Sequence, residues 1–169
     1  LFDIVSTPES TIAVGDGVIL SYESTGWDQE GFGFTQKLHA LAATTDQVIY
    51  AVGEKGTVFL REGGIWKTQP FPVDNDLYAI DTFEGVLAVV GSRGTVVQKN
   101  PEGTWEVLPR PTFDSLHSVR VMENLDILAG GPLGTLYRWN GTQWAKAETP
   151  EEIPLDIRVM LGPRDALPT

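Results

Sequence analysis

Two histidines and the aromatic residues at matching positions are the side chains of this sequence best suited to binding chemistry. Four similar segments each open with a leucine, and the next position holds Phe2, His39, Tyr78 or His117. A trailing segment places Asp156 after a leucine in the same way. Rings, imidazoles and a carboxylate gathered at one place can stack on and hydrogen-bond to a sugar or a peptide. The alternative is that each side chain only caps its strand and packs on its neighbour.

Metal binding has weaker support in the sequence. His39 and His117 would have to join Asp76 or Asp114 in a zinc site, and they lack the short ligand spacing typical of zinc. The acidic run at 74–76 lacks the following glycine and the distal glutamate of a calcium loop. We therefore predict no metal and no cofactor.

Nucleophilic catalysis is also poorly supported. A serine hydrolase site would combine Ser115 and His117 with a carboxylate, but no nucleophile-elbow motif surrounds this serine. We predict no catalytic residue.

Acidic residues dominate the charge of the chain. There are 23 Asp and Glu against 12 Lys and Arg, which gives a net charge of −11. Such a surface repels a phosphate backbone unless a basic patch overrides it, and the sequence has no Lys/Arg run. Anionic membrane surfaces are disfavoured for the same reason, and no apolar stretch approaches the roughly 20 residues of a membrane span. We expect no nucleic-acid partner and no membrane insertion, while cations, neutral glycans and basic partners stay compatible, as does a simple role in solubility.

Cysteine is absent from the 169 residues. Disulfides, thiolate nucleophiles and Cys-ligated metals are therefore excluded, and the compartment is left open. The N-terminus lacks a signal-peptide pattern and begins with Leu1 instead of methionine. We expect the chain to be cleaved, trimmed or cut from something longer.

A repeat of about 39 residues organises the whole sequence. Four tryptophans are each 39 residues apart, at Trp27, Trp66, Trp105 and Trp144. Four glycines that close a preceding turn keep nearly the same period, at Gly17, Gly56, Gly94 and Gly134. Two residue types on one period make chance a poor explanation.

Within one period the apolar residues alternate, which is typical of β-strands. The second copy predicts strands at 38–45, 48–53, 57–61 and 65–69, separated by turns. Prolines in the following stretch, 70–76, break the pattern because proline cannot donate to a strand ladder.

Four short antiparallel strands per repeat predict an all-β fold, a β-propeller of four-stranded antiparallel blades. We expect one propeller over residues 1–169, with blades at about 1–37, 38–76, 77–115 and 116–154. Residues 155–169 then begin a further unit or supply a closing strand, because "LDIRVM" at 155–160 repeats the opening of "LHSVRVM".

The repeat also predicts details of the turns and of the tryptophans. Asn140-Gly141 predicts a two-residue type I′ hairpin, since both central residues of that turn need positive φ. The periodic tryptophans are expected on the outer strands, where they cover the gap between neighbouring blades. Trp139 departs from the period, which leaves an exposed position open for it.

The motif VGxxGT, followed by a strand, a Gly-rich turn and a Trp, resembles the propeller repeats of the photosystem II stability/assembly-factor-like proteins. These belong to the wider group of BNR, or sialidase Asp-box, repeats, and the resemblance covers nearly all of residues 1–154. Only the Gly-to-Trp end of the Asp box is present, at 63–66, 103–105 and 141–144, and the box Asp has no clear equivalent. The resemblance implies scaffolding and binding, with hydrolysis in the sialidase branch. No sialidase role transfers, because the seven arginines are scattered singly.

The turns between the second and third strands and the links between blades share one face of a propeller, together with the channel mouth. This loop face is predicted to carry Glu54, Lys55, Arg93, Asp74, Asp76 and Asp114, beside the residues that follow the opening leucines.

We therefore expect a non-catalytic binding or scaffold module that recognises a protein segment or a glycan on the loop face and at the channel mouth. The alternatives are a sialidase-like glycosidase with carboxylates at the channel mouth, which short loops disfavour, and a structural spacer. The open ring is expected to be completed by a homodimer or by further sequence of a larger chain. Closure by four blades alone is the third option.

Overall fold

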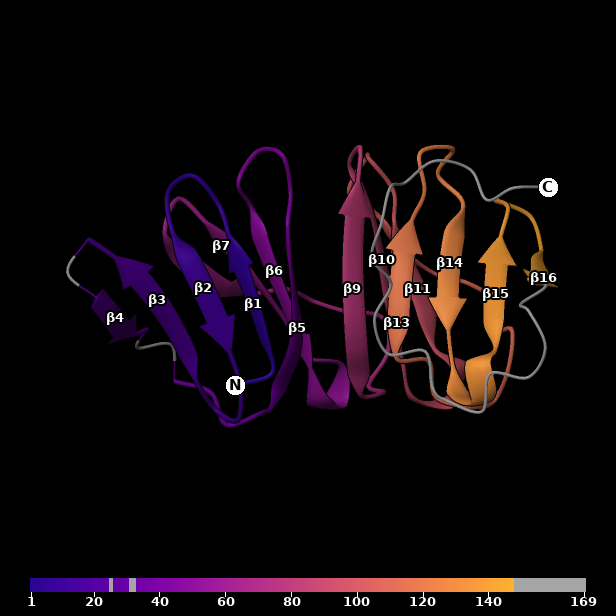
Figure 1. Ribbon diagram of the computed structural model, residues 1–169, viewed down its shortest axis with the longest axis horizontal. Coiled ribbons are helices and arrows are strands. Elements are labelled where there is room, and N and C mark those ends of the chain that lie inside the picture. Colours follow the sequence, from indigo (N-terminus) through magenta and orange to yellow (C-terminus); the bar gives the residue numbers. More distant parts are fainter. Residues whose placement is uncertain (25, 31–32, 148–169) are drawn as a thin grey trace. The chain divides into compact units, whose positions relative to one another are not determined.

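The computed structural model describes residues 1–24, 26–30 and 33–147. This part of the chain forms four four-stranded antiparallel sheets, and in each sheet the strands follow one another in chain order (Figure 1). The all-β prediction and the four-stranded blades are thus confirmed. The chain divides into two compact units, residues 1–77 and 78–169, and each is described by itself.

Unit 1 contains two sheets. The first consists of β1 (Asp3–Ser6), β2 (Thr11–Val14), β3 (Ile19–Glu23) and β4 (Gly26–Gln29). The second consists of β5 (Leu38–Ala43), β6 (Ile49–Gly53), β7 (Val58–Glu62) and β8 (Ile65–Thr68). The sequence predicted the strands of this second sheet to within one or two residues at each end.

Unit 2 repeats the arrangement. One sheet consists of β9 (Leu77–Phe83), β10 (Val86–Gly91), β11 (Val96–Lys99) and β12 (Trp105–Val107). The other consists of β13 (Ser118–Val121), β14 (Ile127–Gly130), β15 (Leu136–Trp139) and β16 (Trp144–Lys146). Aliphatic residues fill the middle of these strands, because strands that are covered on both faces need apolar side chains on both.

Within unit 1 the two sheets pack face to face in a defined order. We call the side of a sheet that carries its periodic tryptophan its Trp face. The Trp face of β5–β8, with Leu41, Phe59 and Trp66, shares one core with Ile12 and Ile19 from the other face of β1–β4. Trp66 is only 6% exposed.

Unit 2 follows the same order. The Trp face of β13–β16, with Ile127, Trp139 and Trp144, shares one core with Val86 and Val96 from the other face of β9–β12. In both units, therefore, the second sheet presents its Trp face to the sheet before it.

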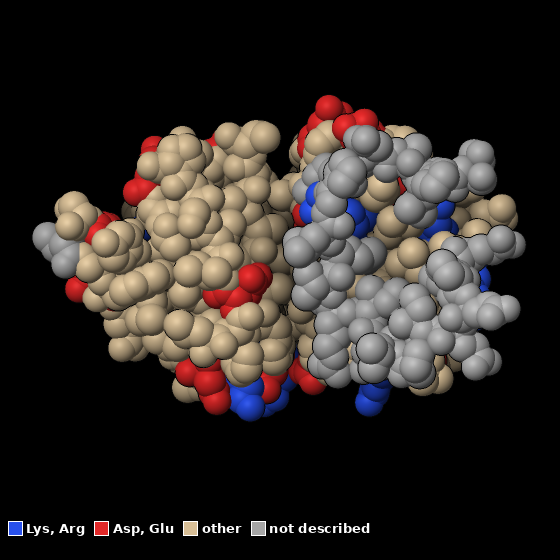
Figure 2. Space-filling view, viewed as in Figure 1, with Lys and Arg blue, Asp and Glu red and all other residues tan. Residues whose placement is uncertain are grey.

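Two tryptophans differ from the prediction. Trp139 is buried, at 7% exposure, because it pairs with Trp144 across β15 and β16 and so lies on the packed face. The predicted alternative of an exposed Trp139 is therefore wrong. Trp27, expected to cover a gap between blades, is 48% exposed, and Figure 2 shows a broad area over β1 to β3 with few charged side chains.

Each G-x-x-G-T motif forms a short 3-10 turn between the second and third strands of its sheet, at Glu54–Gly56, Ser92–Gly94 and Pro132–Gly134. Gly56 has a φ of +65°, and its N–H donates to the carbonyl of Asn75 at 2.8 Å. A Cβ at Gly56 would overlap the carbonyl oxygen of Val73, and one at Gly94 would overlap that of Thr112. The glycine is needed because the link to the next sheet crosses directly over the turn.

The Asn140-Gly141 hairpin is not of type I′. Trp139 pairs with Trp144, so the loop has four residues, and only Gly141 of the predicted pair has positive φ. The side-chain oxygen of Asn140 accepts the backbone N–H groups of Thr142 and Gln143 at 3.0 and 2.9 Å. Asn thus acts as a local acceptor that replaces a backbone carbonyl, which favours a wider turn.

Some predictions fall outside the described residues. The trailing strand at 155–160, the closing role of 155–169 and the position of Asp156 are among them. In the described part of the chain, no helix has the length and apolar character needed to cross a membrane.

Candidate functional site

The predicted contact residues next to the opening leucines come together in two pairs. In unit 1 the rings of Phe2 and His39 lie 5.6 Å apart between centroids, tilted by 50°. In unit 2 the rings of Tyr78 and His117 lie 5.0 Å apart and stack, with an interplanar angle of 24°. Each unit therefore carries one aromatic–histidine pair, formed by the first strand segments of its two sheets.

Both pairs lie at the end of the sheets where the G-x-x-G-T turns lie. His39 follows Leu38, which pairs with Gly53, the residue before the Glu54–Gly56 turn. His117 donates its backbone N–H to the carbonyl of Gly130 at 2.8 Å, two residues before the Pro132–Gly134 turn. The starts of the first strands and the turns thus share one end of each unit.

In each unit, an aspartate on the core-facing side of one sheet's first strand bonds to the first strand of the other sheet. Asp3 accepts the backbone N–H of Leu41 at 2.7 Å, and Asp81 accepts that of Val121 at 2.8 Å. In both cases the carboxylate belongs to the first sheet of the unit. The amide belongs to the first strand of the second sheet, which is an edge strand of that sheet. A charged acceptor makes such a bond stronger than a neutral one, so it fixes the offset at which the two rings meet.

These two aspartates were not predicted as functional or structural residues. The available signal was a carboxylate on an otherwise apolar, alternating strand, on the face that the pattern assigns to the core. Buried carboxylates need partners, so Asp3 and Asp81 could have been predicted to accept a backbone amide.

The gathering of all four of these side chains at one channel mouth remains a prediction. Phe2 and His39 belong to unit 1, and Tyr78 and His117 belong to unit 2, which are described separately. Asp156 lies outside the described residues.

The predicted loop-face residues of unit 1 include two that support the backbone. The Lys55 N–H donates to Asp76 Oδ1 at 2.9 Å, and Glu54 Oε2 lies 3.5 Å from the backbone N of Lys37 as its acceptor. The Lys55 side chain is exposed and its backbone is left-handed, with φ 55°. Asp76 and Glu54 thus fasten the links to the turn, whereas Lys55 and the exposed Asp74 are available to a ligand.

The predicted loop-face residues of unit 2 are Arg93 and Asp114. Arg110 Nη1 lies 3.5 Å from the Arg93 carbonyl as its donor, and the Arg110 guanidinium lies 5.3 Å from the ring centre of Phe113. Asp114 accepts the Thr112 hydroxyl at 3.2 Å and closes a local turn. Phe113 is 81% exposed, so this link presents a large ring beside the Arg110 cation, and Arg110 was not among the predicted residues.

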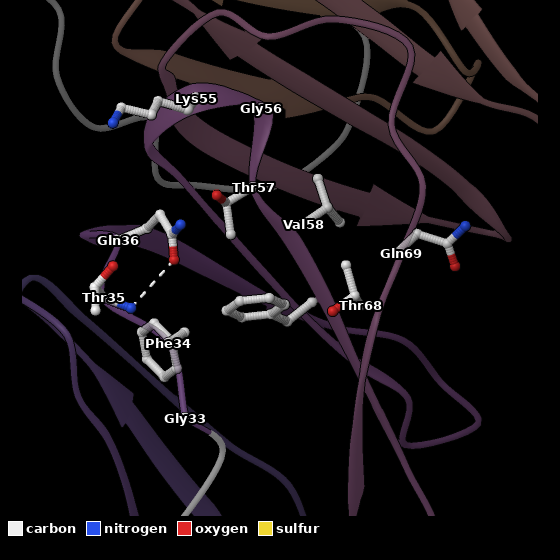
Figure 3. Close-up of a pocket in the computed structure, with 11 residues that line it drawn as sticks. Gly33, Phe34, Thr35, Gln36, Lys55, Gly56, Thr57, Val58, Thr68 and Gln69 are labelled. Carbon is white, nitrogen blue, oxygen red and sulfur yellow. Dashed lines mark hydrogen bonds between the residues drawn. The ribbon is translucent and has the colours of Figure 1, made fainter.

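Unit 1 also contains an open pocket of about 630 Å³ beside the Glu54–Gly56 turn. Figure 3 shows Gly33 to Gln36 on one side and Thr68 and Gln69 on the other, with Lys55 extending from the turn. Phe34 and Phe59 meet edge to face at 5.1 Å and form the apolar part of the lining. The pocket was missed because the 30–37 link reads as irregular, polar sequence. Its hydroxyls and amides can hydrogen-bond a neutral polar group, which suits a peptide or a sugar.

The described ranges contain no cluster of metal-binding side chains. No group of three or more His, Asp or Glu side chains lies close enough together there to hold an ion. The arrangement of rings, hydroxyls and exposed cations is suited to noncovalent recognition.

Comparison with solved structures gives the fold. The structure of YCF48 bound to D1 peptide matches with a TM-score of 0.66 at 12% identity, over 88% of this chain and 54% of that chain. Streptogramin B lyase matches with a TM-score of 0.74 at 13% identity, over 88% of this chain and 54% of that chain. The WD40 β-propeller domain of Doa1 matches with a TM-score of 0.66 at 15% identity, over 85% of this chain and 52% of that chain.

The chain spans about half the length of these structures. No family model and no curated protein matches the sequence. The four sheets of this chain and their structural matches show that it has the fold of a β-propeller.

Proposed function

We propose that this chain is a non-catalytic binding module that holds a protein segment against the loop end of its blades. The observation that carries the proposal is the aromatic–histidine pair, which occurs once in each unit at the same place. Stacked rings offer contact area at low cost in conformational entropy, and an imidazole adds a hydrogen bond of defined direction. The pocket beside Lys55 adds amide and hydroxyl groups for a peptide backbone.

A protein segment is favoured over a glycan by one comparison. A propeller of similar fold, YCF48, has been solved with a D1 peptide bound to it. The proposal treats residues 1–169 as one propeller of the photosystem II assembly-factor-like, BNR-type group. A glycan ligand is the competing outcome of the test.

Selection from a random-peptide phage library, run in parallel with a glycan array, tests the proposal on the 169-residue chain. We expect the library to yield peptides whose affinity falls at least about tenfold in Tyr78→Ala and His117→Ala, which corresponds to about 1.4 kcal/mol. Leu125→Ala is the matched control, because Leu125 is exposed in the turn at the opposite end of the same sheet. Enrichment on the glycan array alone, or equal losses in the control, would refute the proposal.

Catalysis is tested separately, since one of the similar folds belongs to a lyase. The binding-module proposal predicts no turnover of aryl glycosides by the purified chain. Turnover that disappears when a loop-face carboxylate, Asp74 or Asp114, is changed to Asn would restore the glycosidase alternative.

A further inference from the structure

The Trp face of β1–β4 is an exposed apolar surface. Strand pairing places eight residues on it in two rows: Ile4, Ala13, Leu20 and Gln29, then Ser6, Thr11, Tyr22 and Trp27. Ile4, Tyr22 and Trp27 are 57%, 47% and 48% exposed. Single exposed apolar residues are ordinary, but three large ones on one sheet face form a patch of the kind that takes part in association.

The same face is buried in the second sheet of each unit. Ile4 corresponds to Leu41 and Val119, which are each 7% exposed, and Trp27 corresponds to the buried Trp66. These residues are buried because the opposite face of the preceding sheet packs on them. The Trp face of β1–β4 therefore corresponds to a face that a preceding sheet covers in the other cases, but the described part of unit 1 contains no sheet before β1–β4.

The chemistry of the patch defines what fits it. All eight positions are uncharged, although the chain carries 35 charged residues in 169, 12 basic and 23 acidic. Figure 2 shows few charged side chains over β1 to β3. In both units the face that covers a Trp face is aliphatic and built from residues such as Ile12, Ile19, Val86 and Val96. An aliphatic sheet face is thus the matching surface, and a charged peptide is not.

We propose that a second copy of this chain supplies that sheet, so that two chains associate through the Trp27 face. This chain covers only 51–57% of the similar propellers. Two copies with four sheets each supply a comparable length and stay within the usual range of about four to eight blades. Association would also bury Trp27 and Tyr22. Trp and Tyr are among the residue types that most often dominate the binding energy of an interface.

Light scattering coupled to size exclusion tests the proposal on the whole 169-residue chain across a dilution series. The wild type is expected at twice 18.5 kDa, and Trp27→Glu at 18.5 kDa. Ile65→Glu is the matched control and is expected to stay dimeric, because Ile65 is 64% exposed on β8 of the same unit but lies off the Trp27 face. Tyr22→Glu provides an independent disruption of the same patch.

Circular dichroism of each variant confirms that a monomer is folded before its mass is interpreted. A wild type that is monomeric throughout the dilution series would overturn the proposal. So would a dimer that survives both Trp27→Glu and Tyr22→Glu, because another surface would then hold the chains together. Dissociation of Ile65→Glu to the same extent would also assign the contact elsewhere.

Discussion

Unit 1 places Arg61 opposite Trp66 across β7 and β8, whereas unit 2 places Trp139 opposite Trp144 across β15 and β16. Arg61 is 13% exposed in its side chain and pairs at 3.2 Å with Glu30, the residue after β4, while also lying 3.4 Å from the Ser10 hydroxyl. Trp139 instead packs against Trp144 at 5.4 Å between ring centres, and Trp144 Nε1 donates to the carbonyl of Pro109.

The difference shows which parts of the repeat are fixed by the fold. Strand register, the outer tryptophan and the aspartate-to-amide bond are the same in both units. The residue opposite the tryptophan can be an ion-paired arginine or a second aromatic ring. The pairing of two sheets thus depends on filling the space between them more than on one residue type.

The largest expected effect separates two adjacent residues of β8. Trp66→Ala should lower the free energy of unfolding by about 3–5 kcal/mol, because it leaves a cavity between the sheets. Ile65→Ala should change it by no more than about 0.5 kcal/mol, since Ile65 is exposed. Urea denaturation measures both, and equal losses would show that the sheets do not pack through the Trp face.

The next effect concerns the turn glycines. Gly56→Ala and Gly94→Ala should each lose roughly 2–4 kcal/mol, because the new Cβ meets the link's carbonyl as well as an unfavourable φ. Gly63→Ala has positive φ but open space around its Cβ, so it should lose only about 1–2 kcal/mol. A loss at Gly63 as large as that at Gly56 would mean that backbone strain alone sets the cost.

The ion pair between Arg61 and Glu30 in unit 1 should matter somewhat less. Arg61→Met is expected to lower the free energy of unfolding by about 2–3 kcal/mol, because Glu30 is left largely buried without its cation. The exposed pair of Lys67 and Glu62 should contribute no more than about 0.5 kcal/mol when Lys67→Met breaks it. Restoration of most of the loss by adding Glu30→Gln would support this cause, and a Lys67 effect as large as that of Arg61 would refute it.

The contact shared by both units should give matching losses. Asp3→Ala and Asp81→Ala are each expected to lower the free energy of unfolding by about 1.5–2 kcal/mol, because each leaves a backbone amide without its charged acceptor. Asn at either position keeps an acceptor oxygen and should restore part of the loss. A large effect in one unit and none in the other would end the equivalence of the two aspartates.

The smallest effect has the opposite sign. Lys55 and Leu133 occupy left-handed backbone at equivalent turn positions, with φ 55° and 53°. Glycine relieves that strain and loses some entropy, so Lys55→Gly and Leu133→Gly should each stabilise by up to about 1 kcal/mol. Thermal melting detects the increase, and a decrease in both would show that the side chains make stabilising contacts.

Most of the fold could be predicted from the sequence, because strand alternation and the tryptophan period are local and repeated. The strands β5 to β8 were predicted to within one or two residues at each end. The burial of Trp139 was missed because the prediction used only the 39-residue period of the tryptophans. It did not use the pairing of Trp139 with Trp144 across the β15–β16 hairpin. The turn at Asn140 was misjudged because a dipeptide rule cannot tell whether the Asn side chain or the backbone closes the loop.

The candidate site was predicted in its residue types but not in its pairing. Position after the opening leucine identified Phe2, His39, Tyr78 and His117, yet only the structure shows which rings meet. The pocket at Phe34 and Phe59 joins a link to a strand 25 residues away, and no periodic signal connects them. Long-range contacts of irregular segments leave no pattern in a single sequence.

Residue-resolved hydrogen exchange tests the central claim, that the two sheets of each unit are held together at their first strands, beside the aromatic–histidine pairs. We expect the amides of Leu41 and Val121 to exchange slowly, and Asp3→Ala to accelerate exchange at Leu41 while Val121 stays protected. Fast exchange of both amides in the wild type, at the rate expected of an unstructured peptide, would contradict this claim.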